Sequence, residues 1–241
     1  MEAAMRAPVL ITGPGGRVGT GLRRHWQRRY ALRLFDLRSP SELGPGETSV
    51  VGSIVDAGAV LAAAQGCRAI VHLAATADEA DFVGELVPNN VIGLYNVLEA
   101  AIVQGVPRLI FASSVQVLSG YGREVFVPDS DPVRPWTRYA CTKVFGEALC
   151  RYYHERHGLE VVCLRLGAVP HPDRDRPEGR SRIYLSGRDC AGFIAGALDA
   201  EPAPEGGFAV ISVMSQNGAG IRDLQRAERL LGYRPLDDSG V

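Results

Sequence analysis

Cysteine is scarce in this chain, and none of it has the spacing of a metal or redox motif. The 241 residues include five cysteines, an odd number that forms no C-x-x-C pair. This usage indicates neither a disulfide framework nor a zinc site. We therefore expect free thiols, no bound metal and a reduced, cytoplasmic setting.

An excess of one charge is also missing. The 26 basic and 27 acidic side chains give a formal net charge of −1, which does not support a nucleic-acid partner. No apolar run is long enough to span a membrane, and residues 1–8 lack the apolar stretch of a signal peptide. We therefore expect a soluble protein, bound to neither nucleic acid nor membrane, that acts on a small molecule.

Strand and helix signals alternate through the first 167 residues. The apolar run at 8–12 ends in glycines, as a buried parallel strand does. Repeated β-α units of this length predict an α/β fold with a doubly wound parallel sheet. The expected strands are 8–12, 31–36, 49–54, 69–74, 108–113 and 160–166, and the expected helices are 18–30, 56–65, a stretch ending near 104, and 138–156.

A glycine-rich turn follows the first expected strand. Gly13, Gly16 and Gly19 form G-x-x-G-x-x-G, in which glycines permit a tight turn and close approach of the backbone to a pyrophosphate. Asp36 ends the next strand, where a carboxylate can bind both ribose hydroxyls of an adenosine and repels a 2′-phosphate. The pattern predicts a dinucleotide site that prefers NAD. NADP is the alternative cofactor, because Arg38 could bind the 2′-phosphate.

Tyr139 and Lys143 are four residues apart on an expected helix, so their side chains share one face. A nearby ammonium stabilises a phenolate, so we expect Lys143 to lower the pKa of Tyr139 from about 10 toward neutrality. Such a tyrosine can act as a general acid or base. Ser113 and Ser114 end the fifth expected strand, at the sheet edge where ligands bind.

Six features in a fixed order resemble a known family. They are ITGPGGRVG from residue 11, Asp36, HLAA from residue 72, NNVIGLYNVLEAA from residue 89, FASSVQV from residue 111 and YACTKVFGE from residue 139. The chain resembles the extended short-chain dehydrogenases/reductases of the NAD-dependent epimerase/dehydratase family. We expect a Rossmann core at 1–167 and a small C-terminal substrate-binding appendage with a lid loop at 168–241, interleaved with the core.

The resemblance implies a role for each matching residue. Ser114 would polarise the reacting oxygen, Tyr139 would be the acid/base, and Lys143 would anchor the ribose and modify the pKa of Tyr139. The expected cofactor-binding residues are Gly13, Gly15, Gly16, Arg17, Val18, Gly19, Asp36, Leu37, Ser53, Ile54, Leu73, Ala74, Ala75, Asn90, Ser113, Tyr139 and Lys143.

Departures from the family pattern narrow the chemistry. The sugar dehydratases of the family carry an acidic pair after the catalytic hydroxyl, whereas this chain has Val115 and Gln116. Dehydration is therefore disfavoured. Ser53 stands where an aspartate usually meets the adenine. The short region after Gly167 favours a small substrate, such as a sugar, a sugar acid or a related alcohol.

Uronate dehydrogenases are the nearest likeness, through the GLYN and FASS segments and an arginine-bearing loop at 170–182. In those enzymes an arginine of this loop binds the substrate carboxylate, which implies Arg180 or, next, Arg182 in this chain. A solvated basic loop is the alternative. The expected substrate-binding residues are Thr76, Val115, Gln116, Arg180 and Arg182.

The predicted function is an NAD(P)-dependent oxidoreductase that transfers a hydride between nicotinamide and a small sugar, sugar acid or related alcohol or carbonyl. An NAD-dependent sugar epimerase is the second prediction. A dinucleotide-binding protein without activity is less favoured, because it would not need Ser114, Tyr139 and Lys143 together. The family often packs the helix of the Tyr–Lys pair across a dimer axis, so a homodimer is also expected.

Overall fold

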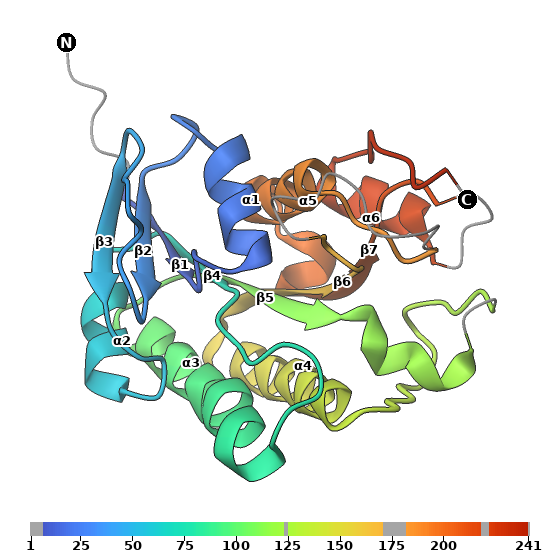
Figure 1. Cartoon of the computed structure of the whole chain (residues 1–241), viewed down its shortest axis with the longest axis horizontal. Coiled ribbons are helices and arrows are strands. Elements are labelled where there is room, and N and C mark those ends of the chain that lie inside the picture. The colour runs from blue at the N-terminus through green and yellow to red at the C-terminus, as the bar shows by residue number, and fades with distance from the viewer. Residues whose placement is uncertain (1–6, 123–124, 171–181, 218–221, 241) are drawn as a thin grey trace.

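The apolar runs of the sequence form the strands of a parallel sheet. The structure, a computed structural model, describes residues 7–122, 125–170, 182–217 and 222–240. In these residues seven parallel strands pair in the order β3-β2-β1-β4-β5-β6-β7 (Figure 1), which confirms the predicted doubly wound Rossmann fold. The strands are β1 (Val9–Thr12), β2 (Leu32–Asp36), β3 (Glu47–Val51), β4 (Ala69–His72), β5 (Arg108–Ser114), β6 (Glu160–Leu166) and β7 (Phe208–Val213).

Helices cover both faces of the sheet. Figure 1 shows α1, α5 and α6 on one face and α2, α3 and α4 on the other. Side chains of a strand point alternately to the two faces of the sheet. Val9 and Ile11 therefore pack in the first core, beneath α1, α5 and α6, while Leu10 packs in the second core, beneath α2, α3 and α4. The helices are α1 (Arg17–His25), α2 (Ala57–Ala64), η1 (Phe82–Ile92), α3 (Gly93–Val103), η2 (Val115–Tyr121), α4 (Arg138–His157), α5 (Gly187–Asp199), η3 (Pro204–Gly207) and α6 (Leu224–Leu231).

Several boundaries differ from the expected ones, and two of the differences are the ends of α1 and β3. Helix α1 ends at His25 rather than at residue 30, and Arg28 then takes a φ of 63°, in the left-handed region that ends helices. Strand β3 ends at Val51, which leaves Ser53 and Ile54 in the following loop. Both residues are thereby placed beyond the carboxyl end of the sheet.

The region after Gly167 adds a strand and two helices to the sheet and its core. No strand was expected there, yet β7 pairs with β6 and extends the sheet. Phe193 of α5 and Leu231 of α6 are buried in the same core as Val9 and Ile11. The C-terminal region therefore completes the sheet and one of its two covering layers.

The segments η1 and α3 form one continuous helix, Phe82–Val103, of 22 residues. We expected no apolar run long enough to span a membrane, but this helix meets that requirement by length and composition alone. Half of its most apolar window is buried inside the protein, and its buried residues Leu94 and Val97 belong to the second core. This is the pattern of a core helix in a globular protein.

Candidate active site

The site begins where the strand order reverses. The chain runs from β1 outward to β3, then returns to β4 on the other side of β1, and ligands bind beyond such a point. There the turn after β1 meets the end of β4 very closely. Gly13 has a φ of +73°, and a Cβ on it would lie 2.8 Å from the Cα of Ala74. Gly19 is equally restricted, because its Cβ would lie 2.5 Å from the carbonyl oxygen of Gly13.

The N-terminus of α1 opens onto this turn. Gly16 is its N-cap residue and supplies no side chain to the first free N–H groups of the helix. Gly15, Gly16 and Arg17 are exposed, while Val18 is half-buried in the first turn. Free N–H groups and the helix dipole make such a terminus a binding site for phosphate. The glycine turn therefore fits the pyrophosphate of a dinucleotide.

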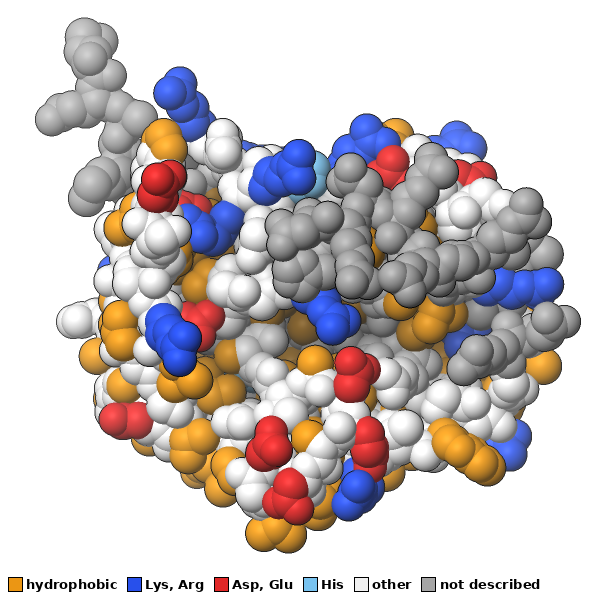
Figure 2. Space-filling view, viewed as in Figure 1, with side chains coloured by type: hydrophobic (Ala, Val, Ile, Leu, Met, Phe, Trp, Pro, Cys, Tyr) orange, Lys and Arg blue, Asp and Glu red, His pale blue; other side chains and the backbone are white. Residues whose placement is uncertain are grey.

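A groove of about 710 Å³ extends from the glycine turn across the ends of β1, β2 and β4. Asp36 lies on its wall and accepts hydrogen bonds from the N–H groups of Gly15, at 3.0 Å, and of Leu37, at 2.7 Å. Figure 2 shows side chains of both charges spread over this side of the molecule. Expected site residues that line the groove are Gly13, Gly15, Gly16, Asp36, Leu37, Ser53, Ile54, Leu73, Ala74, Ala75 and Thr76.

Two expected cofactor residues make internal contacts instead. The buried side-chain amide of Asn90 exchanges hydrogen bonds with the backbone of Thr76, at 2.8 and 3.0 Å, and donates to Thr142 on α4. Ser113 is also buried and donates to Glu147, at 2.6 Å. The side chains of Asn90 and Ser113 therefore hold the walls of the site, whatever their backbones contact.

Helix α4 brings Tyr139 and Lys143 to the end of β5. Thr137 caps the helix by accepting the N–H of Ala140, which fixes the register of both residues. Lys143 is buried, and its Nζ donates to the carbonyl oxygen of Ala112 at 2.8 Å. The same Nζ lies 5.6 Å from the centre of the Tyr139 ring.

Ser114 completes the group, because its hydroxyl is close enough to the Tyr139 phenol to lower the pKa of that phenol. Its Oγ also accepts the N–H of Gln116 at 3.2 Å. The spacing of the sequence thus brings Ser114, Tyr139 and Lys143 together at the carboxyl end of β5.

The expected lowering of the Tyr139 pKa is wrong in this structure. Burial raises the pKa of Tyr139 to about 12, the charge of Asp78 adds to this effect, and the hydrogen bond from Ser114 opposes it. Burial lowers the pKa of Lys143 to about 8, although Cys150 and Glu147 oppose that shift. The low polarity around both groups disfavours their charged forms and outweighs their attraction.

The expected substrate residues are divided among three settings. The Thr76 hydroxyl faces the groove and accepts from Asn89 at 2.8 Å. The Gln116 side chain reaches Asp78 and Thr137, while Val115 is buried against Met214. Arg182 is half-buried near the start of α5, and Arg180 lies outside the described residues.

Thr12 is a contributor that the sequence analysis missed. Its Oγ1 accepts the N–H groups of Leu73 and Ala74, each at 3.2 Å, and so holds the end of β4 against the glycine turn. Its partner His72 is a packed core histidine, since it is buried and hydrogen-bonded. A polar residue at the end of an apolar strand was the available signal for Thr12.

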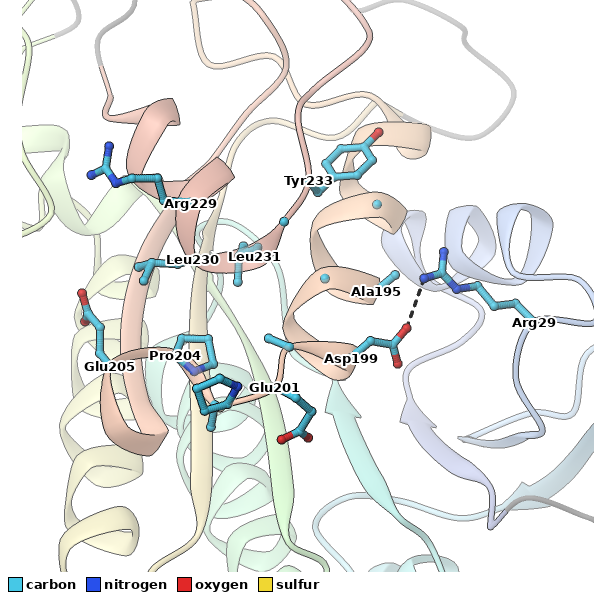
Figure 3. Close-up of a pocket in the computed structure, with 16 residues that line it drawn as sticks. Arg29, Ala195, Asp199, Glu201, Pro204, Glu205, Arg229, Leu230, Leu231 and Tyr233 are labelled. Atoms are coloured by element: carbon cyan, nitrogen blue, oxygen red, sulfur yellow. Dashed lines mark hydrogen bonds and ion pairs between the residues drawn. The ribbon is translucent and has the colours of Figure 1, made fainter.

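A second groove, of about 630 Å³, lies between α5, α6 and the turn at 201–205 (Figure 3). Arg29, Asp199 and Glu201 are among its lining residues, and Arg29 pairs with Asp199 at 3.1 Å. None of the expected site residues in the described part of the chain lines this groove. The chemistry-bearing side chains therefore gather at the carboxyl edge of the sheet.

Comparison with known proteins agrees with this geometry. The model of the NAD dependent epimerase/dehydratase family matches residues 9–188. The chain is 31% identical to an NAD-dependent glucose-6-phosphate dehydrogenase of Haloferax volcanii, over 98% of this chain and 95% of that one. It is 34% identical to a uronate dehydrogenase of Agrobacterium fabrum, over 96% and 85% of the two chains.

Solved structures give the same result. The crystal structure of uronate dehydrogenase from Agrobacterium tumefaciens superposes with a TM-score of 0.86 at 33% identity, over 96% of this chain and 85% of that one. A mutant of that enzyme is known in complex with NAD. These matches confirm the predicted NAD-dependent oxidoreductase. This chain belongs to the NAD-dependent epimerase/dehydratase family.

Proposed function

We propose that this protein oxidises a hydroxyl group of a small sugar or sugar acid, with NAD as hydride acceptor. The observation that carries the proposal is the meeting of Ser114, Tyr139 and Lys143 at the end of β5, in the same sheet edge as the glycine turn. Relatives named as sugar-phosphate, sugar and uronate dehydrogenases support the substrate class. Because these relatives are dehydrogenases, net oxidation is proposed in preference to epimerisation.

The residues divide the work as follows. Ser114 donates a hydrogen bond to the substrate oxygen. Tyr139 passes its own phenol proton to solvent, and its phenolate oxygen then accepts the proton that the substrate oxygen loses. Lys143 would bind a ribose of the cofactor, and its Nζ also holds the strand end through the carbonyl oxygen of Ala112. Gly13, Gly16 and the N–H groups of α1 would hold the pyrophosphate of the cofactor, and Asp36 its adenosine ribose. NAD, when bound, supplies the acceptor for the hydride.

The proposal also assigns roles in substrate binding. Thr76 and Gln116 would bind hydroxyl groups, and Val115 would shape the apolar side of the pocket. Arg182, with Arg180 from the same segment of sequence, would pair with a substrate carboxylate or phosphate. The region 168–241 would thus act as the substrate-binding part, although β7 and α5 also build the core.

The test is a substrate panel of uronates, aldoses, sugar phosphates and polyols, with NAD or NADP, followed by nicotinamide absorbance. Tyr139→Phe should lower kcat by about 100-fold or more, because it removes the proton acceptor. Tyr152→Phe, which alters an exposed tyrosine on the same helix, should leave kcat unchanged. The proposal fails if no member of the panel is oxidised, or if Tyr139→Phe retains full activity.

We also propose a cytoplasmic homodimer that binds neither nucleic acid nor membrane. All five cysteines are unpaired, which suits a reducing compartment. Tyr95 and Val103 on α3 and Phe145 on α4 expose large apolar side chains, and both helices cover the same face of the sheet, where a second copy could bury them. Sedimentation velocity should detect a dimer that Phe145→Glu converts to a monomer. A monomeric wild-type protein would contradict this part of the proposal.

A further inference from the structure

The end of β5 is held by α4 at three consecutive residues. Tyr139, Lys143 and Glu147 recur every fourth residue, so they share one face of the helix. Tyr139 lies beside the hydroxyl of Ser114, Lys143 donates to the carbonyl oxygen of Ala112, and Glu147 accepts from the hydroxyl of Ser113. Ser113 faces away from the groove, yet its tether fixes the backbone next to Ser114.

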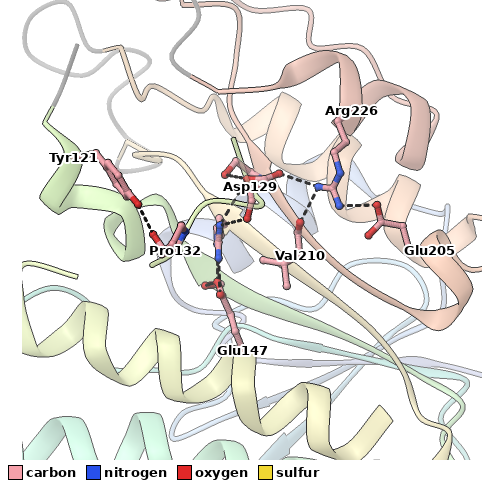
Figure 4. Close-up of polar contacts among 10 residues, drawn as sticks. Tyr121, Asp129, Pro132, Glu147, Glu205, Val210 and Arg226 are labelled. Atoms are coloured by element: carbon pink, nitrogen blue, oxygen red, sulfur yellow. Dashed lines mark hydrogen bonds and ion pairs between the residues drawn. The ribbon is translucent and has the colours of Figure 1, made fainter. Parts of the chain in front are cut away.

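Glu147 is itself fixed from behind the strand. Arg165 of β6 donates to both of its carboxylate oxygens, each at 2.9 Å, and the two side chains are only 4% and 9% exposed. Arg165 also donates to the carbonyl oxygen of Asp129, at 3.2 Å. The Asp129 carboxylate accepts from Ser212 of β7 and from Arg226 of α6 (Figure 4). A chain of polar contacts therefore runs from α6 to the floor of the candidate active site.

Such an arrangement needs a reason, because a buried ion pair adds little to stability. Removing two charges from water costs roughly what their attraction returns, and apolar side chains of the same size often do as well. The position of this pair, one helical turn beyond Lys143 and bonded to the neighbour of Ser114, supplies a functional reason.

We propose that Glu147, held by Arg165, is a positioning residue for the reaction: it fixes Ser114 through Ser113 and keeps a negative charge behind Lys143. The inference rests on the proposed function, in which Ser114 and Lys143 act on substrate and cofactor. Glu147 touches neither, and works through the two residues that do.

The charge of Glu147 acts on an ammonium that has few other partners of opposite sign. The titratable and charged groups that act on Lys143 are Glu147 and Cys150 on α4, Tyr139 on the same helix and His72 on β4. Cys163 and Arg165 of β6 lie behind them, next to Glu147. Cys150 and, after it, Glu147 oppose the burial that lowers the pKa of Lys143, and Glu147 is the carboxylate among these groups. Removing its charge should therefore let Lys143 lose its proton at lower pH.

The sequence makes this measurable, because Lys143 is the only lysine among the 241 residues. In protein labelled with ¹³C-lysine, the single side-chain Cε signal reports its titration directly, with no substrate needed. Glu147→Gln keeps the shape and the acceptor for Ser113 but removes the charge. We expect it to lower the titration midpoint by about one pH unit. Glu147→Asp, which keeps the charge, and Glu205→Gln, at the exposed end of the same network, should leave the midpoint near that of the wild type.

Activity supplies the second measurement. The alkaline limb of the kcat profile should move with the Lys143 midpoint in Glu147→Gln and stay in place in Ser113→Ala. Ser113→Ala keeps the ion pair and should lower kcat about threefold or more, because Ser114 loses its tether. A folded Glu147→Gln with a wild-type midpoint would overturn the proposal. If Glu147→Gln does not fold, the Ser113→Ala variant tests the proposal instead. A wild-type kcat in Ser113→Ala would overturn the proposal, and a reduced kcat would support it.

These results separate the inference from the proposed function. The substrate panel with Tyr139→Phe tests the function alone. The lysine titration tests the charge of Glu147 even if no substrate is oxidised.

Discussion

Thr12 at the end of β1 and His72 at the end of β4 are joined by a hydrogen bond of 2.8 Å between Thr12 Oγ1 and His72 Nδ1. The bond requires a ring nitrogen that accepts, since Thr12 already accepts two backbone N–H groups. His72 is therefore neutral in the folded protein. Burial, aided by the charge of Lys143, lowers its pKa to about 3.

This pair predicts an acid-sensitive fold. Between pH 6.5 and 3 the unfolded chain binds a proton at His72 that the folded protein does not, so stability falls as pH falls through this window. His72→Asn keeps a polar acceptor without a titrating ring and should flatten the dependence. Urea unfolding at several values between pH 4 and 7 measures it. His157→Asn, at an exposed histidine, should behave like the wild type, and equal slopes in all three proteins would contradict the prediction.

Lys143→Met should abolish activity and raise the free energy of unfolding. The folded pKa of about 8 lies below the unfolded value, so burying the ammonium costs stability in full below pH 8, and the cost fades as pH rises toward 10. At pH 7 the substitution removes a destabilising cost of about 3 kcal/mol, but it also removes the bond to Ala112, which stabilises the fold by about 1 kcal/mol. Urea unfolding should show a gain of about 2 kcal/mol at pH 7 that shrinks by pH 10, in a protein without activity. Arg151→Met, at an exposed site on α4, should show no such gain.

Asp36 should control the choice between NAD and NADP. Its carboxylate lies on the groove wall beside Arg38, where it would repel a 2′-phosphate. Asp36→Ser should raise the ratio of kcat/KM for NADP over NAD by about tenfold or more, while Arg38→Ala should lower it. Steady-state kinetics with each cofactor measure the ratio. An unchanged preference in Asp36→Ser would show that the adenosine lies elsewhere.

Gly13→Ala should weaken cofactor binding for a steric reason. A Cβ at Gly13 would meet the backbone of Ala74 at 2.8 Å, in addition to the strain of a φ of +73°. Gly66 has a φ of +68° with no atom within 4 Å, so Gly66→Ala isolates the strain alone. We expect Gly66→Ala to cost about 1 kcal/mol and to keep the Kd for NAD. Calorimetric titration should show weaker binding by Gly13→Ala, and equal affinities would refute the close approach.

The fold and the site were predictable to different degrees. The parallel sheet followed from the alternation of apolar runs and helices up to residue 166, and the glycine turn, Asp36, Ser114, Tyr139 and Lys143 followed from local patterns. Strand β7 was not predicted, although its run FAVISV is strongly apolar. The prediction that no apolar run could span a membrane was wrong by length and composition, since Phe82–Val103 is long and apolar enough, but this helix packs in a core.

The sequence by itself determined which chemical groups this protein has and the order in which the chain presents them. The spacing of four that aligns Tyr139, Lys143 and Glu147 is a property of any helix. Only the tertiary structure decided their protonation, because a pKa depends on burial and on charges that distant segments supply. That is why Tyr139 and Lys143 both resist ionisation here, and why the carboxylate behind them is fixed by Arg165, from a strand that the helix meets only after folding.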